Sequence, residues 1–283
     1  MKNIRIIDSN QIENAVCELF LDANINLPAD VRKSLTVAKN CETVGICKAM
    51  LERLEENADL AKQSSVPICQ DTGMAIVFIE LGQDVHITGK PLKQAVNDGV
   101  ARAYEVGYFR KSVVNHPLIR KNSGDNTPAI LHTEIVEGDK IKITACPKGF
   151  GSENMSALRM FNPSVTIDEI VGFVADTVFS AGANPCPPII VGVGIGGSFE
   201  YCAFLAKKAL LRRIGEYNSD EQFASLEKRI LEAVNATGVG VQGLGGSNTA
   251  LWAAVEGYAT HIAGLPVAVN ISCHVTRHSE VVI

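Results

Sequence analysis

The sequence predicts a mixed α/β (α+β) protein in which helices dominate and the strands form small β-sheets. Long segments repeat apolar side chains every three to four residues, which is typical of helices, and short β-branched apolar runs are typical of strands. No linker rich in proline and serine interrupts the 283 residues, of which 46% are hydrophobic. We therefore expect residues 1–283 to bury a sizeable core as a single, helix-rich domain.

The first half of the chain alternates helical and strand-forming segments. Residues 10–62 have helical periodicity, and the β-branched run MAIVFIELG at residues 74–82 predicts a buried strand. A second helix is expected over residues 91–108. Residues 129–147 contain two alternating runs around the turn sequence EGD, and this pattern predicts a β-hairpin.

The second half contains a strong signal for the start of a helix. Thr166 and Glu169 have the spacing of a capping box, so a helix is expected to begin there, and Gly182 can end it. Further along we expect a strand, a glycine turn and a helix over residues 189–213, a helix over residues 249–261, and a strand that ends at Cys273.

Charge and hydropathy exclude several classes of protein. The net charge is −5 and no basic cluster is present, so we expect no nucleic-acid partner. Apolar runs are broken well before the ~18 residues that a membrane helix needs, and the first residues contain no signal-peptide pattern. We therefore expect a cytoplasmic protein without a membrane partner, in which the eight cysteines stay reduced rather than forming disulfides.

Glycine motifs raise the question of a nucleotide site. Gly192-x-Gly194-x-x-Gly197 matches the dinucleotide fingerprint, but the helix after it is followed by a polar and then helical segment instead of a strand ending in an acidic residue. A nucleotide site is therefore disfavoured. The run GIGGS at residues 194–198 recurs as GLGGS at residues 243–247, each before an expected helix. These turns either offer helix-terminal N–H groups to an anion or serve as tight packing turns.

Three cysteines differ from the others because they stand at the ends of expected elements. Cys69 lies in a polar turn, Cys186 in a proline-rich loop and Cys273 at the end of a strand, whereas Cys41 and Cys47 follow a helical pattern and are expected in the core. No Cys-x-x-Cys pair exists, which excludes zinc-finger and ferredoxin spacings. Three separated thiolates can hold a [4Fe–4S] cluster that leaves one iron open to substrate. From spacing alone, three buried structural cysteines are the default interpretation.

Acid–base and anion-binding candidates accompany these cysteines. Asp71 lies two residues after Cys69, and His261 stands at the end of the expected helix 249–261, where it could face the helix dipole or exchange a proton. Arg110 ends a helix and could clamp a carboxylate. The loop KGFGSENMS, which includes Gly151, could turn backbone N–H groups toward an anion. Each of these features taken alone is more often an ordinary surface or turn residue.

Taken together, the motifs resemble one family. The segments PICQDTG, KGFGSENMS, CPPIIVGVGIGG and GLGGSNTALWA, with a histidine and a cysteine near the end, are similar to the α-subunit or N-terminal domain of class I iron–sulfur hydro-lyases. That family contains the class I fumarases and the related L-tartrate dehydratases. The resemblance runs from about residue 10 to the end of the chain, with the motifs in the family's order.

The resemblance implies a role for each candidate residue. It implies that Cys69, Cys186 and Cys273 are the three ligands of a [4Fe–4S] cluster with one iron open to substrate. It also implies that Asp71 and His261 are the catalytic pair. The substrate-binding residues that it implies are Gln70, Arg110 and Gly151.

The implied reaction is the reversible hydration of fumarate to L-malate, with this chain as the α-subunit. A separate β-subunit is expected to complete the site, because single-chain members of the family continue into a second domain, and an α2β2 assembly is expected. The alternative is the α-subunit of an L-tartrate dehydratase, which converts tartrate to oxaloacetate. A non-catalytic iron–sulfur subunit is disfavoured, because such a subunit would need the three cysteines but not Asp71, Arg110 and His261.

Overall fold

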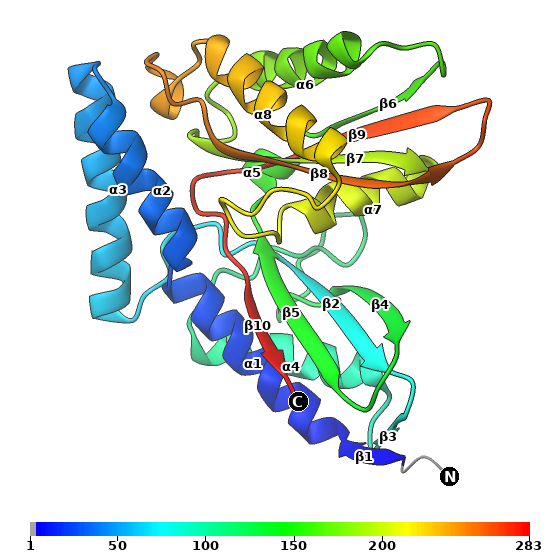
Figure 1. The fold of residues 1–283 in the computed structure, drawn as a ribbon. Coiled ribbons are helices and arrows are strands. Elements are labelled where there is room, and N and C mark those ends of the chain that lie inside the picture. Colours follow the sequence, from blue (N-terminus) through cyan, green and yellow to red (C-terminus); the bar gives the residue numbers. More distant parts are fainter. Residues whose placement is uncertain (1–3) are drawn as a thin grey trace. The chain divides into compact units, whose positions relative to one another are not determined.

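The structure, a computed structural model, describes residues 4–283 and confirms the expected mixed α/β fold (Figure 1). The chain divides into two compact units, each described by itself below. Unit 1 comprises Met1–Pro28, Ala58–Gly149 and Arg277–Ile283, and unit 2 comprises Ala29–Asn57 and Phe150–Thr276. The expectation that residues 1–283 act as one domain stays a prediction. Within residues 4–283, no helix is both long enough and apolar enough to cross a membrane.

Unit 1 combines short strands with long helices. Its elements are β1 (Arg5–Asp8), α1 (Ser9–Ile25), the end of α3 (Gly45–Ser64), β2 (Met74–Gly82), β3 (Val85–Thr88), α4 (Leu92–Val106), β4 (Ile130–Val136), β5 (Ile141–Lys148) and β10 (Ser279–Val282). The helices of residues 10–62, the strand of residues 74–82 and the helix after residue 91 are thus confirmed. Asp8 begins α1 because its side chain accepts the backbone N–H of Asn10 at 2.8 Å.

The main sheet of unit 1 has the strand order β10-β5-β2-β4 (Figure 1). β2 pairs antiparallel with β5 and parallel with β4, so β4 and β5 lie on opposite sides of β2. The predicted hairpin between β4 and β5 is therefore wrong, although both strands exist. α1 packs against α4 and against β5 and β10, and these elements share the apolar core of the unit.

Unit 2 is built around one four-stranded sheet with the order β6-β9-β7-β8. Its elements are α2 (Ala29–Cys41), the start of α3, α5 (Phe150–Glu153), β6 (Ala157–Phe161), α6 (Ile167–Ala181), β7 (Ile189–Gly197), α7 (Phe199–Ala209), α8 (Glu221–Ala236), the 3₁₀ turn η1 (Val241–Gly243), β8 (Ala250–Thr260) and β9 (Leu265–Ser272). Thr166 and Glu169 form the expected capping box at the start of α6, and Gly182 ends that helix.

Helices cover both faces of this sheet. The apolar stripes of α6 and α8 pack on one face with the odd-numbered residues of β7, such as Val191 and Val193. α7 packs on the other face, against β7, β8 and β9 (Figure 1). Because both faces are buried, β7 is a continuous apolar run rather than an alternating one.

The glycines of the apparent dinucleotide fingerprint explain how α7 approaches β7. A Cβ at Gly192 would lie 2.2 Å from the carbonyl oxygen of Ala206, and a Cβ at Gly194 would lie 2.0 Å from that of Cys202. The first two glycines therefore lie within the strand and make room for the helix backbone. This packing role supports the sequence argument against a nucleotide site.

Residues 249–261 form a strand instead of the predicted helix. β8 runs from Ala250 to Thr260 and pairs in parallel with β7 along its length. Ala250, Ala253, Ala254 and Trp252 are buried in the sheet. This tertiary pairing overrides the helix propensity of an alanine-rich segment. As a consequence, the second glycine motif precedes a strand, and His261 follows a strand.

Candidate active site

The Cys69–Gly73 loop lies directly before β2 and is fixed by its own hydrogen bonds. The backbone N–H of Asp71 points at Cys69 Sγ at 3.4 Å, and the N–H of Gly73 donates to Asp71 Oδ1 at 3.0 Å. Gly73 has a φ of +80°, which a glycine adopts without strain. Cys69 and Asp71 are half-buried and Gln70 is exposed, so the loop presents polar atoms at the surface of unit 1.

The same loop is tied to the segment that carries Arg110. Thr72 Oγ1 donates to the carbonyl oxygen of Arg110 at 2.8 Å, and Thr72 is 1% exposed. Arg110 lies four residues beyond the end of α4, and its own side chain is exposed. The structure thus brings the backbone of Arg110 next to the loop of Asp71.

A buried lysine is paired with the first residue after this loop. Lys148, at the end of β5, is opposite Met74 of β2 and is only 2% exposed. Its Nζ donates to the carbonyl of Gly149 at 3.2 Å. A Cβ on Gly149 would lie 3.4 Å from Asp71 Oδ2, an ordinary contact distance, so Gly149 lies beside the Asp71 carboxylate.

Cys186 and Cys273 lie in neighbouring loops of unit 2. His274, the residue after Cys273, contacts the carbonyl oxygen of Cys186 with both its backbone N at 3.5 Å and its Nδ1 at 2.9 Å. Gln242 Nε2 donates to the next carbonyl, that of Pro187, at 2.6 Å. The two cysteine-bearing loops are therefore held together at one end of the sheet.

Exposure separates the candidate ligands from the structural cysteines. All eight cysteines are present as thiols, and Cys69 and Cys273 are half-buried while Cys186 is exposed. The default interpretation of these three as buried structural residues is therefore wrong. The buried cysteines are Cys17, Cys47, Cys146 and Cys202. Cys41 was expected in the core but is exposed on α2, because the helical pattern does not show which face of the helix is covered.

The three candidate thiols are divided between the two units. Cys69 belongs to unit 1, and Cys186 and Cys273 belong to unit 2. Within residues 4–283, no three or more His, Cys, Asp or Glu side chains form a ready-made group of metal ligands.

His261 lies at the opposite end of the unit 2 sheet from Cys273. It follows β8 in the exposed turn before β9, and its Nδ1 accepts the N–H of Ala263 at 3.2 Å. Cys273 follows the other end of β9, next to the start of β7. Because β9 spans the eight residues Leu265–Ser272, the backbones of His261 and Cys273 within one chain are separated by about 25 Å.

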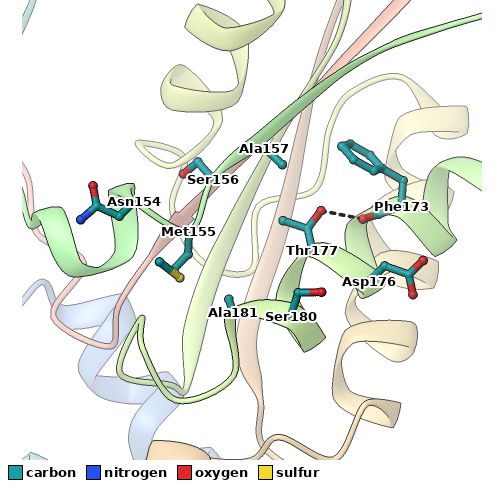
Figure 2. Close-up of a pocket in the computed structure, with 9 residues that line it drawn as sticks. All are labelled: Asn154, Met155, Ser156, Ala157, Phe173, Asp176, Thr177, Ser180 and Ala181. Atoms are coloured by element: carbon teal, nitrogen blue, oxygen red, sulfur yellow. Dashed lines mark hydrogen bonds between the residues drawn. The ribbon is translucent and has the colours of Figure 1, made fainter.

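Gly151 lies on the short helix α5 and is exposed. The residues after this helix line a pocket of about 390 Å³ between β6 and α6 (Figure 2). Figure 2 shows Asn154, Met155 and Ser156 on one side of the pocket, and Phe173 and Thr177 of α6 on the other. None of the predicted site residues lines this pocket.

The second glycine motif binds an anion that belongs to the protein itself. Glu42, 5% exposed, accepts the backbone N–H of Ser247 at 3.1 Å and that of Val44 at 3.0 Å, and also Nδ2 of Asn248 at 2.7 Å. Burial alone would raise the pKa of Glu42, but the hydrogen bonds from Val44, Asn248 and Ser247 outweigh it and the pKa is lowered. A Cβ on Gly246 would lie 2.8 Å from Glu42 Oε2, so this turn is filled by the carboxylate.

Sequence reasoning missed the residues that hold the candidate loops in place. These are Thr72, Tyr104, Asn126, His274 and Arg277, each of which donates a hydrogen bond to a backbone carbonyl or contacts one. A side chain that binds a distant carbonyl leaves no periodic signal in a sequence. The only available clue was that His274 and Arg277 closely follow Cys273.

Comparisons with known proteins agree with this arrangement of motifs. The family model described as "Fumarate hydratase (Fumerase)" matches residues 13–282. The chain therefore belongs to the class I fumarate hydratase and L-tartrate dehydratase α-subunit family, and it is a class I hydro-lyase α-subunit.

Individual relatives cover almost the whole chain. A protein of Methanocaldococcus jannaschii, provisionally named L(+)-tartrate dehydratase subunit alpha, is 44% identical over 276 residues, which are 95% of this chain and 96% of that protein. The L(+)-tartrate dehydratase subunit alpha of Escherichia coli K12 is 29% identical over 97% of this chain and 91% of its own length. The protein of the same name from strain UTI89 is 30% identical over 95% of this chain and 89% of its own length.

Proposed function

We propose that this chain is the α-subunit of an L-tartrate dehydratase, which removes water from L-tartrate and yields oxaloacetate. The observation that carries this proposal is the 44% identity to a protein provisionally named as such an α-subunit, over 95% of the chain. Dehydration breaks the C–O bond at one hydroxyl-bearing carbon and the C–H bond at the other. The resulting enol then becomes the ketone of oxaloacetate.

The proposed cofactor is a [4Fe–4S] cluster held by Cys69, Cys186 and Cys273. Thiolates are the ligands that such clusters take, and all three thiols are at least partly accessible whereas four of the other five are buried. The N–H of Asp71 directed at Cys69 Sγ is the kind of hydrogen bond that stabilises a thiolate. When bound, the cluster supplies a Lewis-acidic iron that makes hydroxide a better leaving group.

The chain's own residues bind and orient the substrate. Arg110, exposed and attached through its carbonyl to Thr72, is proposed to clamp a substrate carboxylate beside Asp71. Gln70 and Gly151 are proposed to contact the substrate through an amide side chain and a backbone N–H. Asp71 is proposed to exchange the proton on carbon, because Oδ1 is held by the N–H of Gly73 and Oδ2 lies beside Gly149, which has no side chain.

His261 is proposed to serve the active site of a second copy of the chain. If Asp71 lies at the cluster that Cys273 helps to hold, the His261 of the same chain is about 25 Å from Cys273 and out of reach. We propose a two-fold pair of chains in which each His261 lies at the other chain's Asp71. This arrangement agrees with the expected α2β2 assembly, and it allows Asp71 and His261 both to have a catalytic role.

A separate β-subunit is proposed to complete the site. The relatives that cover this chain are named as subunits alpha, which supports a second kind of chain in the complex. We propose that the β-subunit supplies further groups that bind the substrate carboxylates, and that the complex acts in the reducing cytoplasm, where its thiols stay available. If this chain alone reaches the full rate after cluster reconstitution, the β-subunit is not required.

Fumarate hydratase is the second candidate. The family model that matches residues 13–282 is described by that name. The dehydration of L-malate to fumarate, which is the reverse of fumarate hydration, breaks the same C–O and C–H bonds on a substrate with one hydroxyl fewer than tartrate. A site built to bind the extra hydroxyl of tartrate would lose a buried hydrogen bond with malate, which gives a discrimination of about 10²-fold or more.

The experiment is a comparison of substrates on the αβ complex, purified anaerobically and loaded with iron and sulfide. We expect kcat/KM for L-tartrate to exceed that for L-malate by at least about 10²-fold. The reverse preference would replace tartrate by fumarate and malate as the physiological pair. A cluster-loaded complex inactive on both substrates would contradict the proposed function.

A further inference from the structure

We propose that Arg277 is a positioning residue for Asp71, because its guanidinium binds the Asp71 carbonyl and fixes the direction of the carboxylate. The proposal rests on the proposed function, in which Asp71 exchanges a proton with the substrate. Arg277 follows Cys273 by four residues and is not one of the residues that the family resemblance singles out.

Arg277 is a buried cation with a specific partner. It is 3% exposed, and its Nη2 donates to the carbonyl oxygen of Asp71 at 2.5 Å. Burying a guanidinium costs free energy unless hydrogen bonds compensate, and a charge-assisted hydrogen bond is about twice as strong as a neutral one. The buried Nε of Arg277 has no hydrogen-bond partner, so the contact with Asp71 is a main part of what holds this charge in place.

The next two carbonyls of the loop are held in the same way. Tyr104 Oη donates toward the carbonyl oxygens of Thr72 at 2.5 Å and Gly73 at 3.0 Å, and Asn126 Nδ2 donates to that of Gly73 at 3.2 Å. Tyr104 and Asn126 are both fully buried. Burial raises the pKa of Tyr104, more than the nearby charge of Arg277 lowers it, so its hydroxyl remains a proton donor. Three successive carbonyls, from Asp71 to Gly73, are therefore bound by buried side chains.

Arg277 has a distinct place in this set because it binds the carbonyl of Asp71 itself. The backbone N–H of Asp71 is directed at Cys69, and Oδ1 is held by Gly73. The bond to Arg277 holds the carbonyl of the peptide between residues 71 and 72 and prevents this peptide plane from rotating. Rotation of the plane would break the hydrogen bond from the N–H of Gly73 to Asp71 Oδ1 and move the carboxylate.

Loss of this bond should therefore affect the chemical step more than substrate binding. A displacement of about 1 Å in a proton-transferring group can cost about 10²-fold in rate. Arg110, the proposed carboxylate clamp, is tied to the loop through Thr72 rather than through Arg277. Substrate binding should therefore change little when Arg277 is replaced.

The test uses the cluster-loaded αβ complex with Arg277→Gln and Arg277→Lys. We expect Arg277→Gln to lower kcat about 10²-fold with KM changed less than about threefold, and Arg277→Lys to recover about a tenth of the wild-type kcat, because an ammonium can still donate to the carbonyl. Arg212→Lys is the matched control, since Arg212 is also largely buried and donates to a backbone carbonyl, that of Val255, at 2.7 Å. The control should lower the melting temperature and leave kcat unchanged.

A second variant covers the case in which Arg277→Gln does not fold. Tyr104→Phe keeps the buried ring but removes the donor to the next two carbonyls, and it should lower kcat about 10-fold with the iron content unchanged. The inference is overturned if Arg277→Lys and Arg212→Lys have the same kcat, or if KM rises while kcat stays the same. A wild-type complex that is inactive on tartrate and on malate overturns the proposed function, and the positioning role falls with it.

Discussion

At the scale of single residues, Glu42 is the clearest case of a carboxylate that the fold uses for structure. It accepts hydrogen bonds from the backbone N–H groups of the next two residues, Thr43 and Val44. It also accepts hydrogen bonds from Ser247 of the glycine motif and from Asn248, which follows the motif. The motif's resemblance to an anion-binding turn is therefore real, but the anion is internal. A second interpretation from the sequence, a packing turn, is also correct, because the carboxylate fills the turn.

Glu42→Gln should destabilise the protein in a pH-dependent way. The folded protein lowers the pKa of Glu42 below its ordinary value of 4.5, so its contribution is fully present above about pH 4.5. That contribution is lost as the pH falls through the lower pKa of the folded state. We expect the variant to lose about 1–3 kcal/mol at pH 7, with a lower melting temperature measured by calorimetry.

The difference between the two proteins should shrink as the pH falls below about 4.5, because Glu42 of the unfolded wild type then takes up a proton that the folded protein binds only at lower pH. Glu232→Gln is the control, since Glu232 is exposed on α8 and should change stability little. A difference between wild type and Glu42→Gln that stays constant from pH 7 to pH 3 would contradict this role for Glu42.

The candidate site residues could be found from the sequence, whereas the residues that support them could not. Cys69, Cys186 and Cys273 stand in recognisable motifs at the ends of elements, and the structure shows that all three are at least partly accessible. Tyr104 and Arg277 bind carbonyl groups whose position depends on the tertiary fold. No local pattern reports such a contact.

At the scale of elements, the packing of α7 on β7 depends on glycine. A Cβ at Gly194 would lie 2.0 Å from the carbonyl oxygen of Cys202 and 2.6 Å from the backbone N of Ala206. The neighbours are backbone atoms, which cannot move aside without displacing the helix. At Gly194 the helix α7 and the strand β7 are therefore too close for any side chain.

Gly194→Ala should destabilise unit 2 by about 2–4 kcal/mol, seen as a lower urea midpoint. Gly172→Ala is the matched control. Gly172 is inside α6, and a Cβ there would meet no atom within 4 Å. We expect the control to stabilise the protein by about 0.5–1 kcal/mol, because alanine favours the helix. Equal effects of the two substitutions would show that α7 does not pack on β7 at this position.

Elements with a local signal were predicted correctly, and elements fixed by distant pairing were not. The capping box at Thr166 and the apolar run at residues 74–82 are local, and both predictions are confirmed. β8 was predicted as a helix, because its alanine-rich sequence shows no alternation when both faces are buried. The turn between β4 and β5 looked like a hairpin because nothing in it shows that β2 lies between the two strands.

At the scale of the whole molecule, the placement of His261 makes a prediction about assembly. Asp71→Asn and His261→Asn should each inactivate the αβ complex. If each site combines Asp71 of one chain with His261 of another, a mixed assembly of the two variants contains one intact site. Coexpression of the two variants should then restore about a quarter of the wild-type activity, because half of the pairs are mixed and each mixed pair has one working site.

The control for this experiment is a mixture of the two variants assembled separately and not exchanged, which should remain inactive. No recovery in verified mixed assemblies would show that Asp71 and His261 of the same chain work together. The length of β9 separates His261 from Cys273 of the same chain. That result would therefore contradict the placement of Asp71 at a cluster held by Cys273.

The most direct test of the account is the iron and acid-labile sulfide content of the anaerobically purified complex. We predict about four irons and four sulfides per α chain in the wild type and in Cys41→Ser, which removes an exposed cysteine that is not a proposed ligand. Cys69→Ser should lose most of the iron together with the activity. An iron-free wild type that still turns over, or a Cys69→Ser variant with full iron content and activity, would contradict the account.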